Sequence, residues 1–380
     1  MNFELTEEQK MIRQSARDFA QRELLSDVLE RDAKGIYPTQ HVKRMAELGF
    51  LGMTVDPEWG GGGMDNVSYA MAIEEISKCD ASVAVILAVH NSLDCYGIEH
   101  FGNDFQKEKF LVPLATGEQI GAFLLSEPEA GSDATSQRTT AVDMGDHYLV
   151  NGTKNWITSA DKGSIYLVMA QTSPELKHKG INALIVDRHA PGISLGPHED
   201  KMGMRSSDTH SVMFTDVIVP KENRIGEEGF GFKFAMKLLE GGRIGIAAQA
   251  LGIAEGAYER ALKYAKERKA FGTEIVNHQA ISFKLATMAT QIEAARHLVY
   301  KAAWLKDNHL PYSKESAMAK YYAAEMAMYV TTEAVQIHGG YGYVKEYHVE
   351  RLMREAKVTQ IYEGTSEIQQ IVISRAIATE

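Results

Sequence analysis

The chain has 380 residues, of which 44% are hydrophobic and 24% are charged. This apolar share is enough to form folded cores, so a chain that is disordered throughout is excluded. At roughly 150 residues per domain, the length indicates two or three domains or one large one. A formal net charge of −11, from 40 basic and 51 acidic side chains, argues against general nucleic-acid binding but leaves room for small anionic ligands.

The expected compartment is the bacterial cytoplasm. The two cysteines, Cys79 and Cys95, form no CxxC pair and no disulfide framework, which favours reducing conditions. The first residues are acidic where a secretory signal needs a basic start, and we recognise no transit peptide, which makes the mitochondrial matrix the weaker alternative. The longest charge-free apolar stretch, about residues 81–93, is shorter than the roughly 20 residues of a membrane span.

Residues 1–120 carry a helical pattern. Thr6 and Gln9 form a capping-box signature, and apolar residues follow Ile12 at helical spacing. Residues 81–89 are apolar nearly all round, which predicts a buried central helix; their valines leave a strand as the alternative. We therefore predict an N-terminal all-α domain over residues 1–120.

Residues 121–232 change to a strand pattern. Residues 148–158 are typical of a hairpin with a tight Asn-Gly turn at Asn151 and Gly152. Three further runs of strand length follow, at residues 164–171, 181–187 and 211–219. The segment predicts a middle antiparallel β domain.

Residues 233–380 return to a helical pattern. Proline-free, alanine-rich runs cover about residues 234–269, 279–308 and 314–338. The third run stops at a glycine pair, Gly339 and Gly340, and a shorter helix lies around Val349. Ser366 and Gln369 form a second capping-box signature that opens a last helix. Helices of this length predict a C-terminal four-helix bundle, so the whole chain is predicted to be an α+β multidomain protein.

Most chemical motifs are absent from the sequence. It contains no GxGxxG, Walker or HExxH sequence. A literal GxSxG at residues 192–196 lacks the strand-turn-helix context of a nucleophile elbow, so we interpret it as a coincidence. A di-iron bundle needs paired Glu-x-x-His motifs, but only Glu175 and His178 match, in a polar loop. No metal site is predicted.

One segment, residues 360–367, remains a candidate for chemistry. Glu363 lies in a predicted loop beside Ile361 and Tyr362, and a carboxylate among apolar and aromatic groups has a raised pKa that suits a general base. Gly364 allows a ligand to approach the backbone, and the next helix directs free N–H groups at the loop. On these residues alone, a surface glutamate near a helix start is the more common explanation.

Five segments together resemble the acyl-CoA dehydrogenase family. They are LSEPEAGSD at residues 125–133, NGTKNWIT at 151–158, RKAFG at 268–272, QIHGGYG at 336–342 and YEGTSE at 362–367. The predicted order of α, β and α segments also matches this family. The resemblance implies an FAD-dependent oxidoreductase that converts an acyl-CoA to the trans-2-enoyl-CoA, with flavin N5 taking the β-hydride. It also implies a homotetramer that passes electrons to an electron-transfer flavoprotein.

The resemblance assigns roles to individual residues. It makes Glu363 the base that removes the α-proton, with its N–H among the donors to the thioester carbonyl. Expected FAD contacts are Phe123, Leu125, Ser126, Ser132, Trp156, Ile157, Thr158, Gln336, Gly339, Gly340, Thr365, Ser366 and Glu367. Expected contacts to the FAD of a neighbouring subunit are Arg268, Phe271 and Gln279. Expected acyl-CoA contacts are Ser132, Glu240, Arg243, Tyr362 and Gly364.

The position of the base narrows the substrate class. In the isovaleryl and long-chain branches of the family the base occupies the position of Gly242, which has no carboxylate here. The sequence is therefore similar to the short- to medium-chain enzymes, and most of all to the short-chain, butyryl-CoA type, which could serve fatty-acid breakdown, amino-acid catabolism or fermentation. Two alternatives stay open: an acyl-CoA oxidase that uses oxygen, and a catalytically inactive acyl-CoA-binding scaffold.

Overall fold

The N-terminal part of the chain is entirely helical. The computed structural model describes residues 4–379, so the first three residues of the segment that we compared with a signal sequence lie outside it. Its elements are α1 (Glu7–Phe19), η1 (Ala20–Leu24), α2 (Val28–Lys34), α3 (Thr39–Glu47), η2 (Pro57–Trp59), α4 (Asn66–Ser77), α5 (Ala81–Val89), η3 (His90–Cys95), α6 (Tyr96–Phe101), α7 (Asp104–Gln106), η4 (Lys107–Leu111) and α8 (Val112–Ala115). The predicted capping box is confirmed: the Thr6 hydroxyl accepts from the Gln9 N–H, and the Gln9 side chain accepts from the Thr6 N–H.

The predicted central helix is confirmed but is longer than expected. All residues of α5 are buried, and the helix continues through η3 and α6 to Phe101. By length and composition alone, the 21 residues Ala81–Phe101 form the one helix of the described residues that could cross a membrane, and 94% of its most apolar window is buried inside the protein. A helix without a polar face suits the centre of a core, which is where this one lies.

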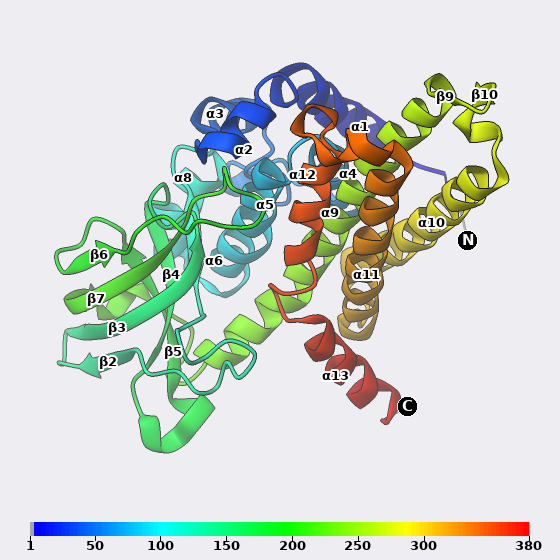
Figure 1. Ribbon diagram of the computed structural model, residues 1–380. Helices are drawn as coiled ribbons and strands as arrows, with labels where there is room; N and C mark the ends of the chain where they lie inside the picture. Colours follow the sequence, from blue (N-terminus) through cyan, green and yellow to red (C-terminus); the bar gives the residue numbers. More distant parts are fainter. Residues whose placement is uncertain (1–3, 380) are drawn as a thin grey trace.

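The middle part of the chain forms a twisted sheet, which lies on the left in Figure 1. Its strands are β1 (Gly121–Leu124), β2 (Thr140–Asp143), β3 (His147–Thr158), β4 (Ile165–Gln171), β5 (Ile181–Asp187), β6 (Ile193–Leu195), β7 (Thr209–Pro220) and β8 (Arg224–Ile225), with short helices η5 (Pro174–Gly180) and η6 (Lys221–Asn223). The order is β6-β7-β3-β2-β4-β5-β8, and β1 also pairs with β4. The sheet is mainly antiparallel as predicted, but β4 pairs in parallel with β1 and β2. The GxSxG residues lie on β6 and its flanks.

The predicted hairpin at residues 148–158 is wrong. These residues form one continuous strand, β3, which pairs with β7 along its length and shifts register between Val150 and Gly152 and again between Lys154 and Ile157. Gly152, with a φ of 147°, serves the first irregularity and not a turn. A Cβ there would lie 2.6 Å from the Cα of Thr139, so close packing also requires the glycine.

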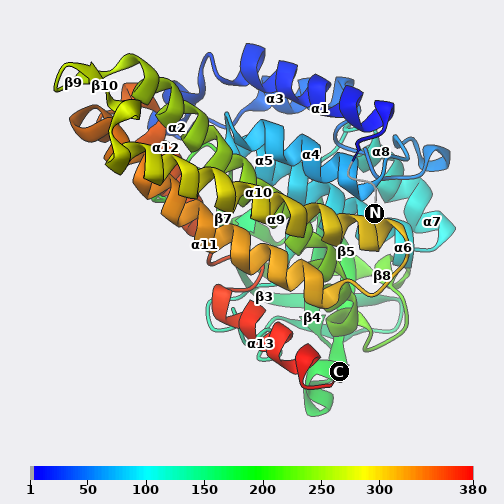
Figure 2. The same cartoon turned by 90° about the vertical axis from the view of Figure 1, so that its right-hand side faces the viewer.

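The C-terminal part is a helical bundle. Its elements are α9 (Gly231–Glu267), β9 (Lys269–Ala270), β10 (Thr273–Glu274), η7 (Ile275–Asn277), α10 (Gln279–Asp307), α11 (Ser313–His338), η8 (Gly339–Tyr343), η9 (Lys345–Tyr347), α12 (Val349–Val358) and α13 (Ser366–Ile377). The long helix α9 packs against α10, α11 and α12 on one side and against α4 and α5 on the other. Figure 2 shows α9, α10 and α11 side by side, with α13 below them in contact with α11. The predicted capping box at Ser366 is wrong, because Thr365 is the N-cap and its side chain accepts from the Ile368 N–H.

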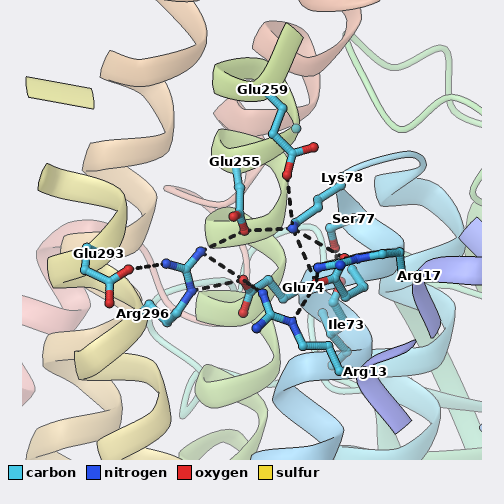
Figure 3. Close-up of polar contacts among 12 residues, drawn as sticks. Arg13, Arg17, Ile73, Glu74, Ser77, Lys78, Glu255, Glu259, Glu293 and Arg296 are labelled. Carbon is cyan, nitrogen blue, oxygen red and sulfur yellow. Dashed lines mark hydrogen bonds and ion pairs between the residues drawn. The ribbon is translucent and has the colours of Figure 1, made fainter. Parts of the chain in front are cut away.

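A buried cluster of charged side chains joins α1 and α4 to α9 and α10 (Figure 3). Glu74 is fully buried and accepts hydrogen bonds from Arg296 Nε at 3.2 Å and from the Tyr300 hydroxyl at 2.6 Å. Glu255 lies 2.8 Å from Arg296 and 3.0 Å from Lys78. Burial keeps the pKa of Glu74 above its ordinary value, although Arg296 acts the other way. The cluster fixes the N-terminal helices on the bundle.

Candidate active site

The loop between α12 and α13 turns sharply at Glu363. Glu363 has a φ of 50° and Gly364 a φ of 88°, so two successive residues are left-handed. For a residue with a Cβ this conformation costs on the order of 1–3 kcal/mol and persists only where the surroundings fix it. Here Gln369 fixes it, because its Nε2 donates to the carbonyl oxygens of Glu363 at 3.1 Å and of Gly364 at 2.8 Å. The turn directs the Glu363 side chain into the protein.

The Glu363 carboxylate is buried, and the surface position that we considered more common is therefore wrong. Neither carboxylate oxygen has a hydrogen-bond partner among the described residues. Burial raises the pKa of Glu363 to about 7, although the cations Lys320 and Arg243 act in the opposite direction. A carboxyl group with these properties changes its protonation state near neutral pH, as a general base must.

Helix α9 forms a wall beside this carboxylate. A Cβ on Gly242 would lie 2.3 Å from Glu363 Oε2 and 3.2 Å from a methyl carbon of Leu93. One turn along the same face, a Cβ on Gly245 would lie 2.6 Å from the Tyr69 hydroxyl, which donates to the Ala88 carbonyl oxygen at 2.9 Å. Side chains of α4 and η3 therefore fill the space along α9 next to Glu363.

Two other expected ligand residues lie close to this loop. The Tyr362 hydroxyl donates to Gln249 Oε1, and Gln249 Nε2 donates to the Ala81 carbonyl oxygen at 2.8 Å. Arg243 is 6% exposed, and its Nε has no hydrogen-bond partner among the described residues. A buried guanidinium with a free donor suits a polar or anionic ligand group. The Glu240 carboxylate, one turn earlier on α9, interacts electrostatically with it.

Sequence reasoning missed three residues of this site. Lys320 Nζ donates to the Gly364 carbonyl oxygen at 2.6 Å, while Gln369 and Tyr69 contact the same region from α13 and α4. No local pattern marks Lys320 or Tyr69, because each acts through residues distant in sequence, and the local pattern at Gln369 marked it only as a capping residue. Lys320 had one available signal: an unpaired lysine within an alanine-rich, otherwise apolar helix face.

A second group of expected residues lies at the sheet. Trp156 is 62% exposed and sits in a β-bulge with a φ of 61°. The Asn155 N–H donates to the Ser126 carbonyl oxygen at 2.9 Å, which joins this bulge to the segment after β1. A large aromatic ring that stands free on a strained, well-anchored bulge suits a planar ligand. The structure therefore brings Leu125, Ser126 and Trp156 together.

The other residues that we expected to contact FAD near the sheet differ in how far they are exposed. The side chain of Ile157 is 2% exposed and packs inside the sheet, so only its backbone remains for a ligand. Phe123 and Thr158 are half-buried, whereas Ser132 is exposed on the loop before β2. At the start of α13, the Ser366 hydroxyl donates to Glu325 at 2.6 Å, and Glu367 is exposed.

The third group lies at the opposite end of the bundle, near β9 and β10 in Figure 1. There a groove of about 1090 Å³ is lined by residues that include Arg268, Phe271, Gly339, Gly340 and Tyr341. Phe271 is 98% exposed, and Arg268 lies over the Tyr341 ring at 5.7 Å. Gln279 and Gln336 are not among the lining residues. At 1.5 Å per residue, His338 lies about 27 Å along α11 from Lys320, so one chain keeps this group apart from Glu363.

Comparison with known proteins identifies the family. Three domain families match: the N-terminal domain of acyl-CoA dehydrogenase at residues 6–118, the middle domain at 122–217 and the C-terminal domain at 229–378. The chain belongs to the acyl-CoA dehydrogenase family. Its members are oxidoreductases, so the predicted enzyme class is confirmed, and the family's three-part fold is the one described above.

Relatives cover the whole chain. A short-chain specific acyl-CoA dehydrogenase of Clostridium acetobutylicum is 50% identical over 99% of this chain and all of its own length. The solved butyryl-CoA dehydrogenase of Megasphaera elsdenii is 49% identical, with a TM-score of 0.98 over 100% of both chains. A chain of the structure described as "Electron transferring flavoprotein of Acidaminococcus fermentans: Towards a mechanism of flavin-based electron bifurcation" is 50% identical, with a TM-score of 0.99 over 100% of both chains.

No group of three or more histidine, cysteine, aspartate or glutamate side chains that could hold a metal ion occurs among residues 4–379.

Proposed function

We propose that the protein oxidises a short-chain acyl-CoA to the trans-2-enoyl-CoA, with Glu363 as the base and FAD as the cofactor. The observation that carries the proposal is the buried Glu363 carboxylate, whose two oxygens have no partner among the described residues. An acyl-CoA dehydrogenase needs such a group, because a proton on the carbon beside a thioester carbonyl is removed only by a desolvated base in contact with it.

The residues at the sheet fit the isoalloxazine of FAD. Trp156 offers an exposed ring on a fixed bulge, and Thr158 at the end of β3 offers a hydroxyl beside it. Phe123, Leu125 and Ser126 would complete this contact, and Thr365 would lie next to it at the start of α13. When bound, FAD supplies the oxidant that takes the hydride from the β-carbon.

In this proposal Glu363 takes up and releases a proton near neutral pH. Because burial places its pKa at about 7, a substantial fraction is ionised at neutral pH and remains a stronger base than a surface glutamate. The carboxylate would accept the α-proton of the acyl-CoA. This step needs no rearrangement of hydrogen bonds, since no described residue occupies either oxygen.

The backbone at Glu363 would bind the thioester carbonyl. No hydrogen bond from its N–H to another backbone group occurs among the described residues, while the carbonyl groups of Glu363 and Gly364 are both held by Gln369. A fixed N–H that faces the carbonyl oxygen stabilises the negative charge that develops there as the α-proton leaves. Arg243 and Glu240 would contact the CoA portion.

Relatives support the proposed chain length and electron acceptor. A short-chain specific dehydrogenase and a butyryl-CoA dehydrogenase are 50% and 49% identical to this chain, and we transfer their substrate class to it. The proposed acceptor is an electron-transfer flavoprotein, because a 50% identical chain comes from a structure described by that name. We also propose a homotetramer, in which Arg268 and Phe271 reach the FAD of another copy from the groove at the far end of the bundle, together with Gln279 at the start of α10, outside the groove lining.

The deciding experiment replaces the base. In Glu363→Gln we expect flavin absorbance to be retained and turnover of butyryl-CoA with a dye acceptor to fall by at least 10²- to 10⁴-fold, the range of a lost general base. Glu108→Gln, at an exposed glutamate of η4, is the matched control and should keep full activity. Near-normal turnover of Glu363→Gln would reject Glu363 as the base.

The same preparation separates the two alternatives. An oxidase would form hydrogen peroxide from oxygen at the rate at which it consumes acyl-CoA, with no need for the dye. A scaffold would be purified colourless and would bind acyl-CoA without converting it. Turnover across an acyl-CoA series from short to long chains would test the proposed substrate length.

A further inference from the structure

Lys320 is a buried lysine on α11 that has no carboxylate within ion-pair distance among the described residues. Its side chain is 0% exposed. Its Nζ donates to a backbone oxygen, the Gly364 carbonyl, at 2.6 Å. Burying an ammonium group is costly unless strong partners compensate for the lost water. A short bond to the residue that follows Glu363 therefore indicates a role at this loop.

The acceptor of Lys320 is part of the strained turn. Gly364 has a φ of 88° and follows Glu363 with a φ of 50°. Gln369 donates to the same Gly364 oxygen at 2.8 Å and is itself fully buried. Lys320 and Gln369 thus hold one carbonyl from two helices, α11 and α13. Only one of these two donors carries a charge.

The charges around Lys320 come from the loop that holds Glu363 and from three helices. Glu363 of the loop and Glu367 of α13 favour its charged form, as does Glu325 of its own helix, while Arg243 of α9 opposes it. Burial outweighs these groups and lowers the pKa of Lys320 to about 8, which leaves it mostly charged at neutral pH. In return, Lys320 is the leading charged group that favours ionisation of Glu363.

The other groups that face Glu363 are few. Arg243 is its second cation, from α9. Tyr69 of α4 and the adjacent Tyr362 are neutral hydroxyls whose own ionisation the Glu363 charge opposes. Neither tyrosine can replace a cation near neutral pH, so loss of Lys320 leaves Arg243 alone.

We propose that Lys320 is a positioning residue for Glu363: its ammonium fixes the turn through Gly364, and its positive charge keeps the Glu363 carboxylate ionised in the free enzyme. This inference rests on the proposed function of Glu363 and adds a residue that controls it. The two contributions are separable, because Gln369 shares the tether but has no charge.

Four variants separate the tether from the charge. Lys320→Met removes both, and Lys320→Gln removes the charge but keeps a polar donor, so that one of them remains informative if the other fails to fold. Gln369→Met removes hydrogen bonds to the same carbonyl and leaves the Lys320 charge in place. Lys320→Arg restores a positive charge. Each is compared with the wild-type holoenzyme.

The first measurement is kcat/KM for butyryl-CoA against pH, which reports the pKa values of the free enzyme. Removing a cation raises the pKa of a nearby carboxyl group, so the rising limb should move to higher pH in Lys320→Met and Lys320→Gln, by about one pH unit or more. Below the limb this corresponds to about tenfold lower kcat/KM. Gln369→Met should lower the plateau without moving the limb, and Lys320→Arg should return the limb toward the wild-type position.

The second measurement does not depend on activity. The infrared carbonyl absorption of the protonated Glu363, assigned by its absence in Glu363→Gln, is titrated with pH in wild type, Lys320→Met and Lys320→Gln. We expect its midpoint to move in parallel with the rising limb. A midpoint that moves while kcat/KM does not would support the role of Lys320 and reject Glu363 as the base.

An unchanged carboxyl midpoint in both Lys320→Met and Lys320→Gln would overturn the inference, whatever their turnover. An equal shift in Gln369→Met would overturn it as well, because the tether and not the charge would then set the titration. Neither result would affect the proposed function, which depends on Glu363→Gln.

Discussion

Gly242 and Glu363 share one space: a Cβ on Gly242 would lie 2.3 Å from Glu363 Oε2. Helix α9 leaves room for the carboxylate only because residue 242 has no side chain. The family resemblance implies that in other branches the base occupies this position on α9, so with Glu363 as the proposed base the two locations converge on the same point. In this chain, therefore, the Glu363 carboxylate can occupy its place only with a glycine at 242.

The first prediction concerns Gly242→Ala. Alanine stabilises a helix by about 1 kcal/mol relative to glycine, so the variant should not weaken α9. We therefore attribute any loss of activity to the contact between the new methyl group and Glu363. A displacement of about 1 Å in a catalytic group costs roughly 10²-fold, and we expect kcat/KM to fall by that order while flavin is retained. Gly241→Ala is the matched control, because its Cβ would meet the flexible end of Lys306 at 3.0 Å. Equal activity of the two variants would contradict the prediction.

The second prediction concerns the stability of Glu363→Gln. The pKa of Glu363 is raised from 4.5 to about 7 in the folded protein, so folding is penalised as pH rises from 4.5 through 7 and the group ionises. Removing the charge should stabilise the protein at pH 8 by up to about 3 kcal/mol and leave it unchanged near pH 4.5. Thermal midpoints at both pH values test this. A lower thermal midpoint for the variant than for wild type at pH 8 would contradict the destabilising effect of the buried, ionised carboxylate.

The sequence predicts more of the fold than of the site. Helical spacing located α9, α10 and α11 to within a few residues, because long amphipathic or apolar runs have no competing pattern. The Asn-Gly pair at Asn151 and Gly152 led to the wrong prediction of a hairpin, because the residues that favour a turn also suit a β-bulge. Only the pairing of β3 with β7 decides between the two. Local pattern alone cannot resolve that choice.

The site shows the same limit. Burial of Glu363 depends on Gly242, Leu93 and Tyr69, which belong to three other elements, and so the residues around Glu363 in the sequence favoured a surface position. Lys320 escaped notice for the same reason, and Gln369 was recognised only as a capping residue. The helices expected on either side placed Glu363 correctly in a loop, the one between α12 and α13, but its burial and its partners depend on packing between distant segments.

The third prediction concerns Trp156. Its ring is 62% exposed, so the folded protein gains little from it, whereas a planar cofactor would cover it. Trp156→Ala should therefore lower the flavin content of the purified protein, and Trp156→Phe should largely restore it. When both proteins are stripped of flavin, the thermal midpoint of Trp156→Ala should differ little from that of wild type, since alanine leaves the bulge intact. Full flavin content in Trp156→Ala would exclude Trp156 from the cofactor site.

The fourth prediction concerns the charged cluster between the N-terminal helices and the bundle (Figure 3). Arg296→Met removes the nearer guanidinium partner of Glu74, which is fully buried, and leaves only Arg13, whose Nη2 lies 4.0 Å from the carboxylate. Breaking one side of a buried ion pair costs about 3–5 kcal/mol, because the remaining charge stays desolvated. Lys284→Met is the control on the same helix: it breaks a pair with Glu333 in which the side chains are 34% and 19% exposed, and should cost about 1 kcal/mol or less. A thermal midpoint for Arg296→Met no lower than that for Lys284→Met would show that the cluster does not hold the two parts together.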